Sequence, residues 1–148
     1  MVPRQHVMQI LLVEDNPADV RLFRQALLEI AAPHRLAVAK DGEDALDYLF
    51  RRGVHSAASA PDLVVLDLNL PRKSGFDILG EIRSDHKLKR TPVVVFTSSG
   101  SQPDIDLAYE LGANMYLQKR QSLEGFEELV RFIVNTWMQT AALPALGQ

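Results

Sequence analysis

The chain contains no cysteine, which excludes a disulfide framework, thiolate catalysis and a zinc–thiolate site. No apolar run approaches the roughly 20 residues that a membrane-spanning helix needs. The first residues also lack the apolar core of a secretory signal. Lysine and arginine form no block and the net charge is −3, which argues against nucleic-acid binding as the main activity. We therefore expect a cytoplasmic protein that binds neither membranes nor nucleic acid.

What is present is an ordinary globular composition, with 148 residues of which 47% are hydrophobic and 24% charged. This length favours one domain with a sizeable core. Strand-like runs alternate with segments of helical periodicity. The expected strands are 8–13, 36–39, 63–67, 92–96 and 114–117, and the last helix is expected over 123–139. Five such units with short connections predict an α/β fold, a doubly wound five-stranded parallel sheet covered by helices on both faces.

Acidic side chains follow two of the expected strands. Asp67 ends the apolar run 63–66, and Glu14 and Asp15 follow the run 10–13. In an open α/β sheet the carboxyl ends of the strands lie at one edge, where ligands bind. Three carboxylates gathered there repel one another unless a cation or a proton joins them. Oxygen ligands of this kind suit Mg²⁺, so the sequence indicates a magnesium site.

A hydroxyl and an ammonium group follow the fourth and fifth expected strands. Thr97 comes directly after the run 92–96, and Lys119 follows the fifth expected strand. Beside a divalent cation, these groups suit a phosphoryl group, whose transfer requires positioning and charge neutralisation. A carboxylate such as Asp67 can itself act as the nucleophile and form an acyl phosphate. Read singly, however, Asp67 could form a turn, and residues 14–16 could simply cap the first helix.

The ordered motifs VEDNP, LDLNLP followed by SG, VVVFTSS and LGANMYLQK resemble the receiver domains of two-component response regulators. The resemblance covers about residues 7–138, and the separations between the motifs are those of the chemotaxis-type receiver. It implies the flavodoxin-like (βα)5 fold for residues 8–139. Residues 1–7 would form an N-terminal extension, and residues 140–148 a C-terminal tail or dimer arm.

The resemblance also implies a role for each matching residue. Asp67 would accept the phosphoryl group from a sensor histidine kinase. Asp15 would ligate Mg²⁺ directly together with Asp67 and the backbone carbonyl of Asn69, and Glu14 would act beside the ion through water. The chain would then be a signalling protein that catalyses only its own phosphotransfer and dephosphorylation.

Further residues would bind the phosphoryl group or respond to it. Thr97 and Lys119 would each contact a phosphoryl oxygen, and Tyr116 would change rotamer with the position of Thr97. Ser99, with Asn69, would tune hydrolysis. In the family the lysine usually precedes a proline through a cis peptide, whereas Arg120 follows it here. Either this bond is cis at a cost of about 2.5–4 kcal/mol, or the loop takes another shape.

A finer resemblance is to the single-domain regulators paired with bacterial phytochromes, carried by ILLVEDNPAD, DGEDALDYL, LDLNLPRKSG and the lysine without proline. It implies a bacteriophytochrome as kinase and a homodimer. On the last helix Phe132 lies roughly opposite the expected core stripe, and the tail contains Leu143 and Leu146, so we expect dimer contacts there. The residues expected in the core stripe are Leu123, Phe126, Val130, Ile133, Val134 and Trp137.

Three other functions fit the sequence less well than a phosphorylated receiver does. A pseudo-receiver would keep the fold and act as a protein-interaction module without phosphorylation, but the complete set of acids, Thr97 and Lys119 argues against it. A nucleotide- or flavin-binding domain would want a glycine-rich phosphate loop after a strand, and none is present. A Mg²⁺ phosphatase of similar fold would want a second aspartate at the position of Asn69.

Overall fold

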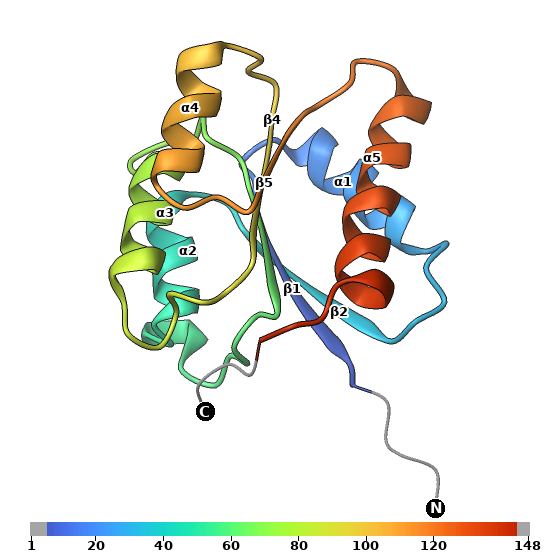
Figure 1. Ribbon diagram of the computed structural model, residues 1–148. Helices are drawn as coiled ribbons and strands as arrows, with labels where there is room; N and C mark the ends of the chain where they lie inside the picture. Colours follow the sequence, from blue (N-terminus) through green and yellow to red (C-terminus); the bar gives the residue numbers. More distant parts are fainter. Residues whose placement is uncertain (1–5, 145–148) are drawn as a thin grey trace, which may run out of the picture.

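Within residues 6–144, which the computed structural model describes, five parallel strands alternate with five α-helices (Figure 1). The strands are β1 Met8–Val13, β2 His34–Ala39, β3 Leu63–Leu66, β4 Val93–Thr97 and β5 Met115–Gln118. The α-helices are α1 Pro17–Leu27, α2 Gly42–Leu49, α3 Gly75–Ser84, α4 Gln102–Glu110 and α5 Leu123–Asn135. A short 3₁₀ helix, η1 Gly53–His55, follows α2, and a π-helical turn, η2 Thr136–Thr140, extends α5.

The strands are ordered β2-β1-β3-β4-β5 and all pair in parallel, which confirms the predicted doubly wound fold. The strand order reverses around β1, which lies between β2 and β3. Such a reversal is where open α/β sheets leave a crevice for ligands, at the carboxyl ends of the strands. Val13 pairs with Leu66 and Thr97 with Gln118, so the strands of this region end close to one edge.

Helices cover both faces of the sheet: α1 and α5 lie on one side, and α2, α3 and α4 on the other (Figure 1). The central strand β3 shows why its sequence is apolar throughout. Leu63 and Val65 join the core cluster beneath α1 and α5, whereas Val64 and Leu66 join the cluster beneath α2 and α3. All four residues are fully buried, as expected for a parallel strand covered on both faces.

Polar caps begin the helices close to the site edge. Asn16 accepts hydrogen bonds from the backbone N–H groups of Ala18 and Asp19, and Pro17 occupies the first helical position of α1. At the start of α3, Ser74 and Asp77 form a reciprocal capping box. The loop-to-helix transitions after β1 and β3 are therefore specified locally by the sequence.

The structure differs from the sequence-based prediction mainly at the edges of elements. The last α-helix ends at Asn135 rather than continuing to residue 139, because η2 replaces its final turn. Leu123 was expected in the core stripe and is 56% exposed. That expectation was wrong because Leu123 is the first residue of α5, directly after its Ser122 cap and outside all three core clusters.

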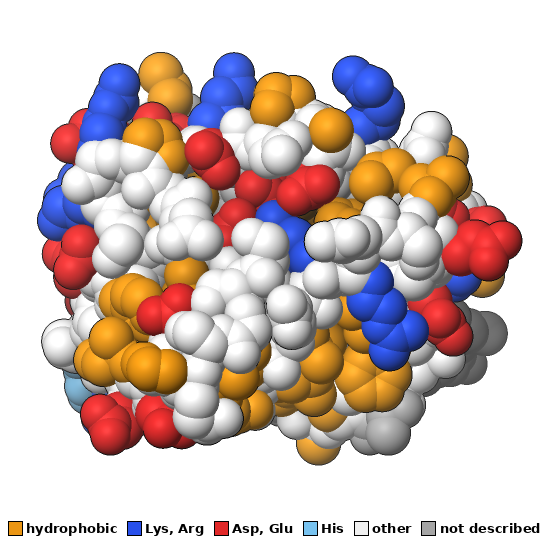
Figure 2. All heavy atoms as spheres, turned by 90° about the horizontal axis from the view of Figure 1, so that it is seen from above, with side chains coloured by type: hydrophobic (Ala, Val, Ile, Leu, Met, Phe, Trp, Pro, Cys, Tyr) orange, Lys and Arg blue, Asp and Glu red, His pale blue; other side chains and the backbone are white. Residues whose placement is uncertain are grey.

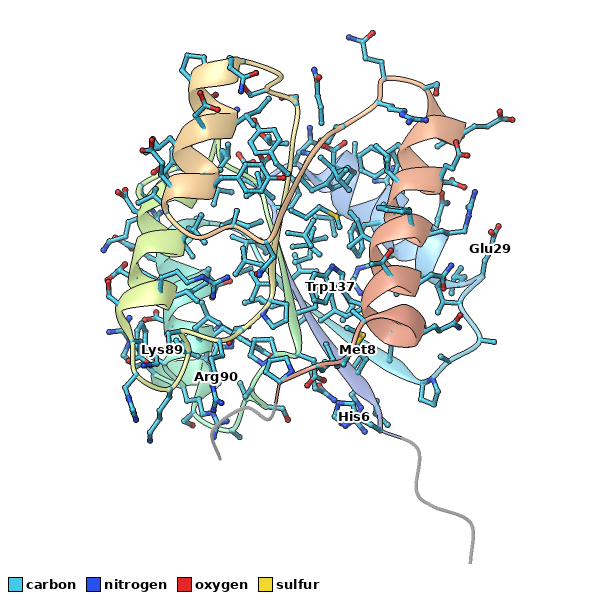
Figure 3. The ribbon with its side chains drawn as sticks, in the orientation of Figure 1. His6, Met8, Glu29, Lys89, Arg90 and Trp137 are labelled. Carbon is cyan, nitrogen blue, oxygen red and sulfur yellow. The ribbon has the colours of Figure 1, made fainter. Side chains whose placement is uncertain are left out.

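The rest of the α5 stripe packs as expected. Phe126, Val130, Ile133 and Val134 are buried, and Trp137 packs from η2 against the cluster that contains Met8 (Figure 3). No helix within residues 6–144 is long and apolar enough to span a membrane.

Candidate functional site

Four functional side chains meet at the carboxyl edge of the sheet. Glu14 directly follows β1, Asp67 follows β3, Thr97 ends β4, and Lys119 follows β5. Seen from this edge, acidic side chains gather at the centre of the face with a basic side chain beside them (Figure 2). Glu14, Asp67 and Thr97 are all buried, with 3%, 7% and 0% of their surface exposed. Burial of polar groups in this number requires compensation by ion pairing or hydrogen bonding.

The acidic groups are close enough to share a cation. One carboxylate oxygen from each of Glu14, Asp15 and Asp67 lies within 4.8 Å of the others. Asp15 is exposed, so the cluster opens toward solvent. The exposed Asn69 lies beside it and donates its backbone N–H to Asp67 Oδ1 at 3.3 Å. Three carboxylates at this separation fit a hard divalent cation, which prefers oxygen ligands and retains bound waters.

Lys119 supplies the positive charge at the centre of the site. Its Nζ lies 2.6 Å from Glu14 Oε1, 2.8 Å from Asp19 Oδ2 and 3.1 Å from Asp67 Oδ2. The lysine side chain is only 9% exposed. An ammonium group with three donors can satisfy three acceptors, and it has three carboxylates here. The pairing offsets part of the cost of removing these charges from water.

Asp19 is the residue that sequence reasoning missed. It lies in the first turn of α1 and is 22% exposed at its side chain, in contact with Lys119 across 100 positions of sequence. No spacing rule predicts such a pair. One feature of the sequence could have indicated it: Asp19 lies in the first turn of the helix that follows Glu14 and Asp15. That turn lies at the edge of the sheet where the site is.

The environment shifts the pKa values of both members of the Glu14–Lys119 pair. Burial raises the pKa of the Glu14 carboxyl above its usual value, although the hydrogen bond and charge of Lys119 oppose that shift. For Lys119, burial alone would lower the pKa, but hydrogen bonds to Asp19 and Glu14 outweigh it and raise the pKa. Lys119 therefore remains a fixed positive charge in the site.

Thr97 and Tyr116 lie on neighbouring strands next to this cluster. The Thr97 hydroxyl is fully buried and has no hydrogen-bond partner among residues 6–144. Tyr116 donates its hydroxyl to the Ser99 carbonyl at 2.8 Å, and its burial raises the pKa of the phenol. Ser99 in turn donates its hydroxyl to Asp104 Oδ2 at 2.6 Å. Of the hydroxyls of Thr97, Ser99 and Tyr116, only that of Thr97 thus has no acceptor among residues 6–144 and could donate to a ligand.

The loop after Lys119 takes a form without a cis peptide. The described residues contain no cis peptide bond, so the Lys119–Arg120 bond is trans. The Lys119 N–H donates to the Thr97 carbonyl at 2.7 Å, which ties the end of β5 to the end of β4. Arg120 points to α5, where its guanidinium lies 3.6 Å from Glu128. The lysine therefore reaches the acidic cluster without the proline that is usual after it.

The residues expected at a dimer contact lie away from this site. Phe132 projects from α5 with 50% of its surface exposed. Leu143 lines a cleft with Met8, Pro33 and Met138 of its own chain. Leu146 lies outside the described residues.

Because the buried Thr97 hydroxyl has no hydrogen-bond partner among residues 6–144, we expect it to lower the stability of the resting protein. Thr97→Val should raise the free energy of unfolding by up to about 1–2 kcal/mol, because it replaces an unpartnered buried hydroxyl by a methyl group of similar size. Thr97→Ser keeps the hydroxyl, removes the methyl and should lower the free energy of unfolding by about 1 kcal/mol. Urea unfolding of both variants without metal or phosphoryl donor measures the difference, and a destabilised valine variant would show that the hydroxyl has a partner.

Comparison with known proteins agrees with this geometry. Residues 10–131 match the family described as "Response regulator receiver domain". Response regulator Rcp1 of Synechocystis sp. is 41% identical over 136 residues, which is 92% of this chain and 92% of that protein.

Two solved structures are similar over nearly the whole chain. The phosphorylated cyanobacterial phytochrome response regulator RcpA has a TM-score of 0.92 and 44% identity, covering 95% of this chain and 100% of that one. The Mn²⁺-bound form of response regulator Rcp1 has a TM-score of 0.89 and 40% identity, covering 93% and 99%. With its sheet order, its acidic edge and these matches, the chain belongs to the response regulator receiver family.

Proposed function

We propose that the chain acts as a single-domain response regulator, with residues 8–139 as its receiver, and that a sensor histidine kinase phosphorylates it on Asp67. The main support for this proposal is the set of side chains that surrounds Asp67. Its carboxylate lies beside Glu14 and Asp15, receives a hydrogen bond from Lys119 and neighbours the strand that ends with Thr97. A nucleophilic carboxylate, candidate ligands for a cation and an ammonium group are thus gathered in one place, with a hydroxyl on the neighbouring strand, and this supports the proposal.

The chemistry follows from what these side chains can do. An Asp67 carboxylate oxygen forms a bond to phosphorus while the phosphorus–nitrogen bond of a phosphohistidine breaks, and that electron pair stays on the imidazole. Lys119 holds its ammonium beside the oxygens that gain charge, and it is already desolvated there. A bound divalent cation, which we propose to be Mg²⁺, would neutralise further phosphoryl charge, held by Asp15, Asp67 and the Asn69 carbonyl with Glu14 beside it.

Return to the resting state requires only water. A water oxygen attacks phosphorus while the bond between phosphorus and the Asp67 oxygen breaks. This restores the Asp67 carboxylate and releases inorganic phosphate, and the protons of the water pass to the phosphate and to solvent. Asn69, two residues after Asp67, and Ser99, two residues after Thr97, are the positions whose side chains would tune this hydrolysis. The protein would catalyse this cycle on itself alone.

The signal would be carried by Thr97 and Tyr116. A phosphoryl oxygen on Asp67 offers the Thr97 hydroxyl the partner that it lacks at rest. Tyr116 is bound to Ser99, in the loop that directly follows Thr97, so displacement of that loop toward the phosphoryl group would alter the tyrosine contact. Local hydrogen bonding would thereby bias a surface between two states.

A bacteriophytochrome is the kinase that we propose. The support is the similarity to RcpA, a phytochrome response regulator, across 95% of this chain. The acceptor site itself does not distinguish one histidine kinase from another, because the phosphoryl group is the same in all of them.

Replacement of the acceptor tests the proposed function. Asp67→Asn should abolish transfer of radiolabelled phosphate from a phosphorylated bacteriophytochrome kinase, because an amide is a poor nucleophile and cannot form the acyl phosphate. Asp47→Asn is the matched control: Asp47 lies on α2, is half exposed and pairs with Arg52. It should accept label at the wild-type rate. Labelling of Asp67→Asn at that same rate would rule out Asp67 as acceptor.

We further propose that the protein forms a homodimer through α5 and the tail, residues 140–148. Phe132 supports this, since a half-exposed aromatic side chain among the charged groups of a helix is suited to a contact. As far as Leu143 the tail lies beside its own chain.

Sedimentation velocity tests the dimer. Phe132→Ser and truncation after Gln139 should each shift the protein toward the monomer, because each removes apolar surface from the proposed contact. Val54→Ser is the control, since Val54 is 94% exposed on η1, away from α5. Equal sedimentation of all four proteins, the unaltered chain included, would remove α5 and the tail from any dimer interface.

A further inference from the structure

Asp19 and Asp77 occupy the same position in the first turns of α1 and α3, but their carboxylates bind different partners. Asp77, the third residue of α3, accepts a hydrogen bond from the backbone N–H of Ser74 and so closes the capping box of that helix. Asp19 has the same position in α1, after the Asn16 cap, but its carboxylate turns to Lys119 at 2.8 Å. The Asn16 N–H is bound instead by Glu14 Oε2, at 3.2 Å. The start of α1 is therefore capped without the Asp19 side chain.

Lys119 and a divalent cation would draw on the same carboxylates in this site. Glu14 and Asp67 belong to the acidic cluster that fits a divalent cation, and both also bind Lys119. A cation that enters the cluster takes negative charge away from the lysine and repels its ammonium. Asp19 binds Lys119 but is not part of that cluster. Among residues 6–144, it is thus the carboxylate partner of Lys119 that a bound cation would leave to the lysine.

We infer that Asp19 is a positioning residue, a second anchor that holds Lys119 in the site while a divalent cation occupies Glu14, Asp15 and Asp67. This inference rests on the proposed metal-dependent function of the same site. Without Asp19, the buried lysine has only the metal-binding carboxylates as partners and competes with the cation for them. With Asp19, cation and lysine are both held beside Asp67, which is the arrangement that phosphoryl transfer requires.

A double-mutant cycle on Mg²⁺ binding tests the inference. Isothermal titration calorimetry of the full chain should show that Asp19→Asn weakens Mg²⁺ binding about tenfold, since Lys119 then competes for Glu14 and Asp67. In a Lys119→Met background the competitor is absent. The same Asp19→Asn change should then weaken binding by no more than about twofold, the effect of one lost nearby charge.

Two further variants separate positioning from a structural role. Asp19→Glu keeps the carboxylate and should recover most of the Mg²⁺ affinity. Asp77→Asn removes the acidic side chain at the same helix position of α3 and should leave Mg²⁺ affinity unchanged. Equal weakening by Asp19→Asn in both Lys119 backgrounds, or none in either, would overturn the inference. Failure of the unaltered chain to bind Mg²⁺ would overturn the proposed function itself, and the inference with it.

Discussion

The structure depends on one ammonium group held among three carboxylates. Lys119 lies within 3.1 Å of Glu14, Asp19 and Asp67, at a place where the protein leaves little access to water. Without that positive charge, or a metal ion in its place, the carboxylates would repel one another and some would take up protons. The negative charge of these carboxylates can therefore be neutralised in two ways, by Lys119 or by a cation from solution. A phosphoryl group on Asp67 would add negative charge to the same cluster, so that Lys119 and the cation could both be bound at the same time.

The sheet provides the geometry that this balance needs. Because β1 lies between β2 and β3, the strand order reverses at the point where Glu14 and Asp67 leave their strands. Buried apolar strands fix the positions of these residues within the core, and the N-terminus of α1 places its positive dipole end beside the carboxylates. Thr97 ends the next strand with a hydroxyl that has no partner among residues 6–144. In the resting site the charges of Lys119 and its carboxylates are paired, but the Thr97 hydroxyl has no acceptor. An anionic group bound there would supply that acceptor.

The sequence predicted most of the fold because apolar runs and turn residues act locally. The run 63–66 specified a buried central strand, and the convergence of Glu14, Asp67, Thr97 and Lys119 followed from the rule that parallel strands end at one edge. Local patterns could not predict that Asp19 turns away from its helix cap to reach a lysine in another element, because that choice depends on tertiary packing. Nor could they decide the peptide after Lys119, which is trans. The roles of the individual site residues remain predictions.

We propose that Asp67, Thr97 and Lys119 together bind one phosphoryl group. A crystal structure of the protein with Mg²⁺ and beryllofluoride, a mimic of that group, would show directly which side chains bind it. We expect a beryllium–oxygen bond to Asp67, with the Thr97 hydroxyl and the Lys119 ammonium each within hydrogen-bond distance of a fluorine. An adduct on another residue, or an adduct on Asp67 that left the Thr97 hydroxyl without a partner, would contradict it.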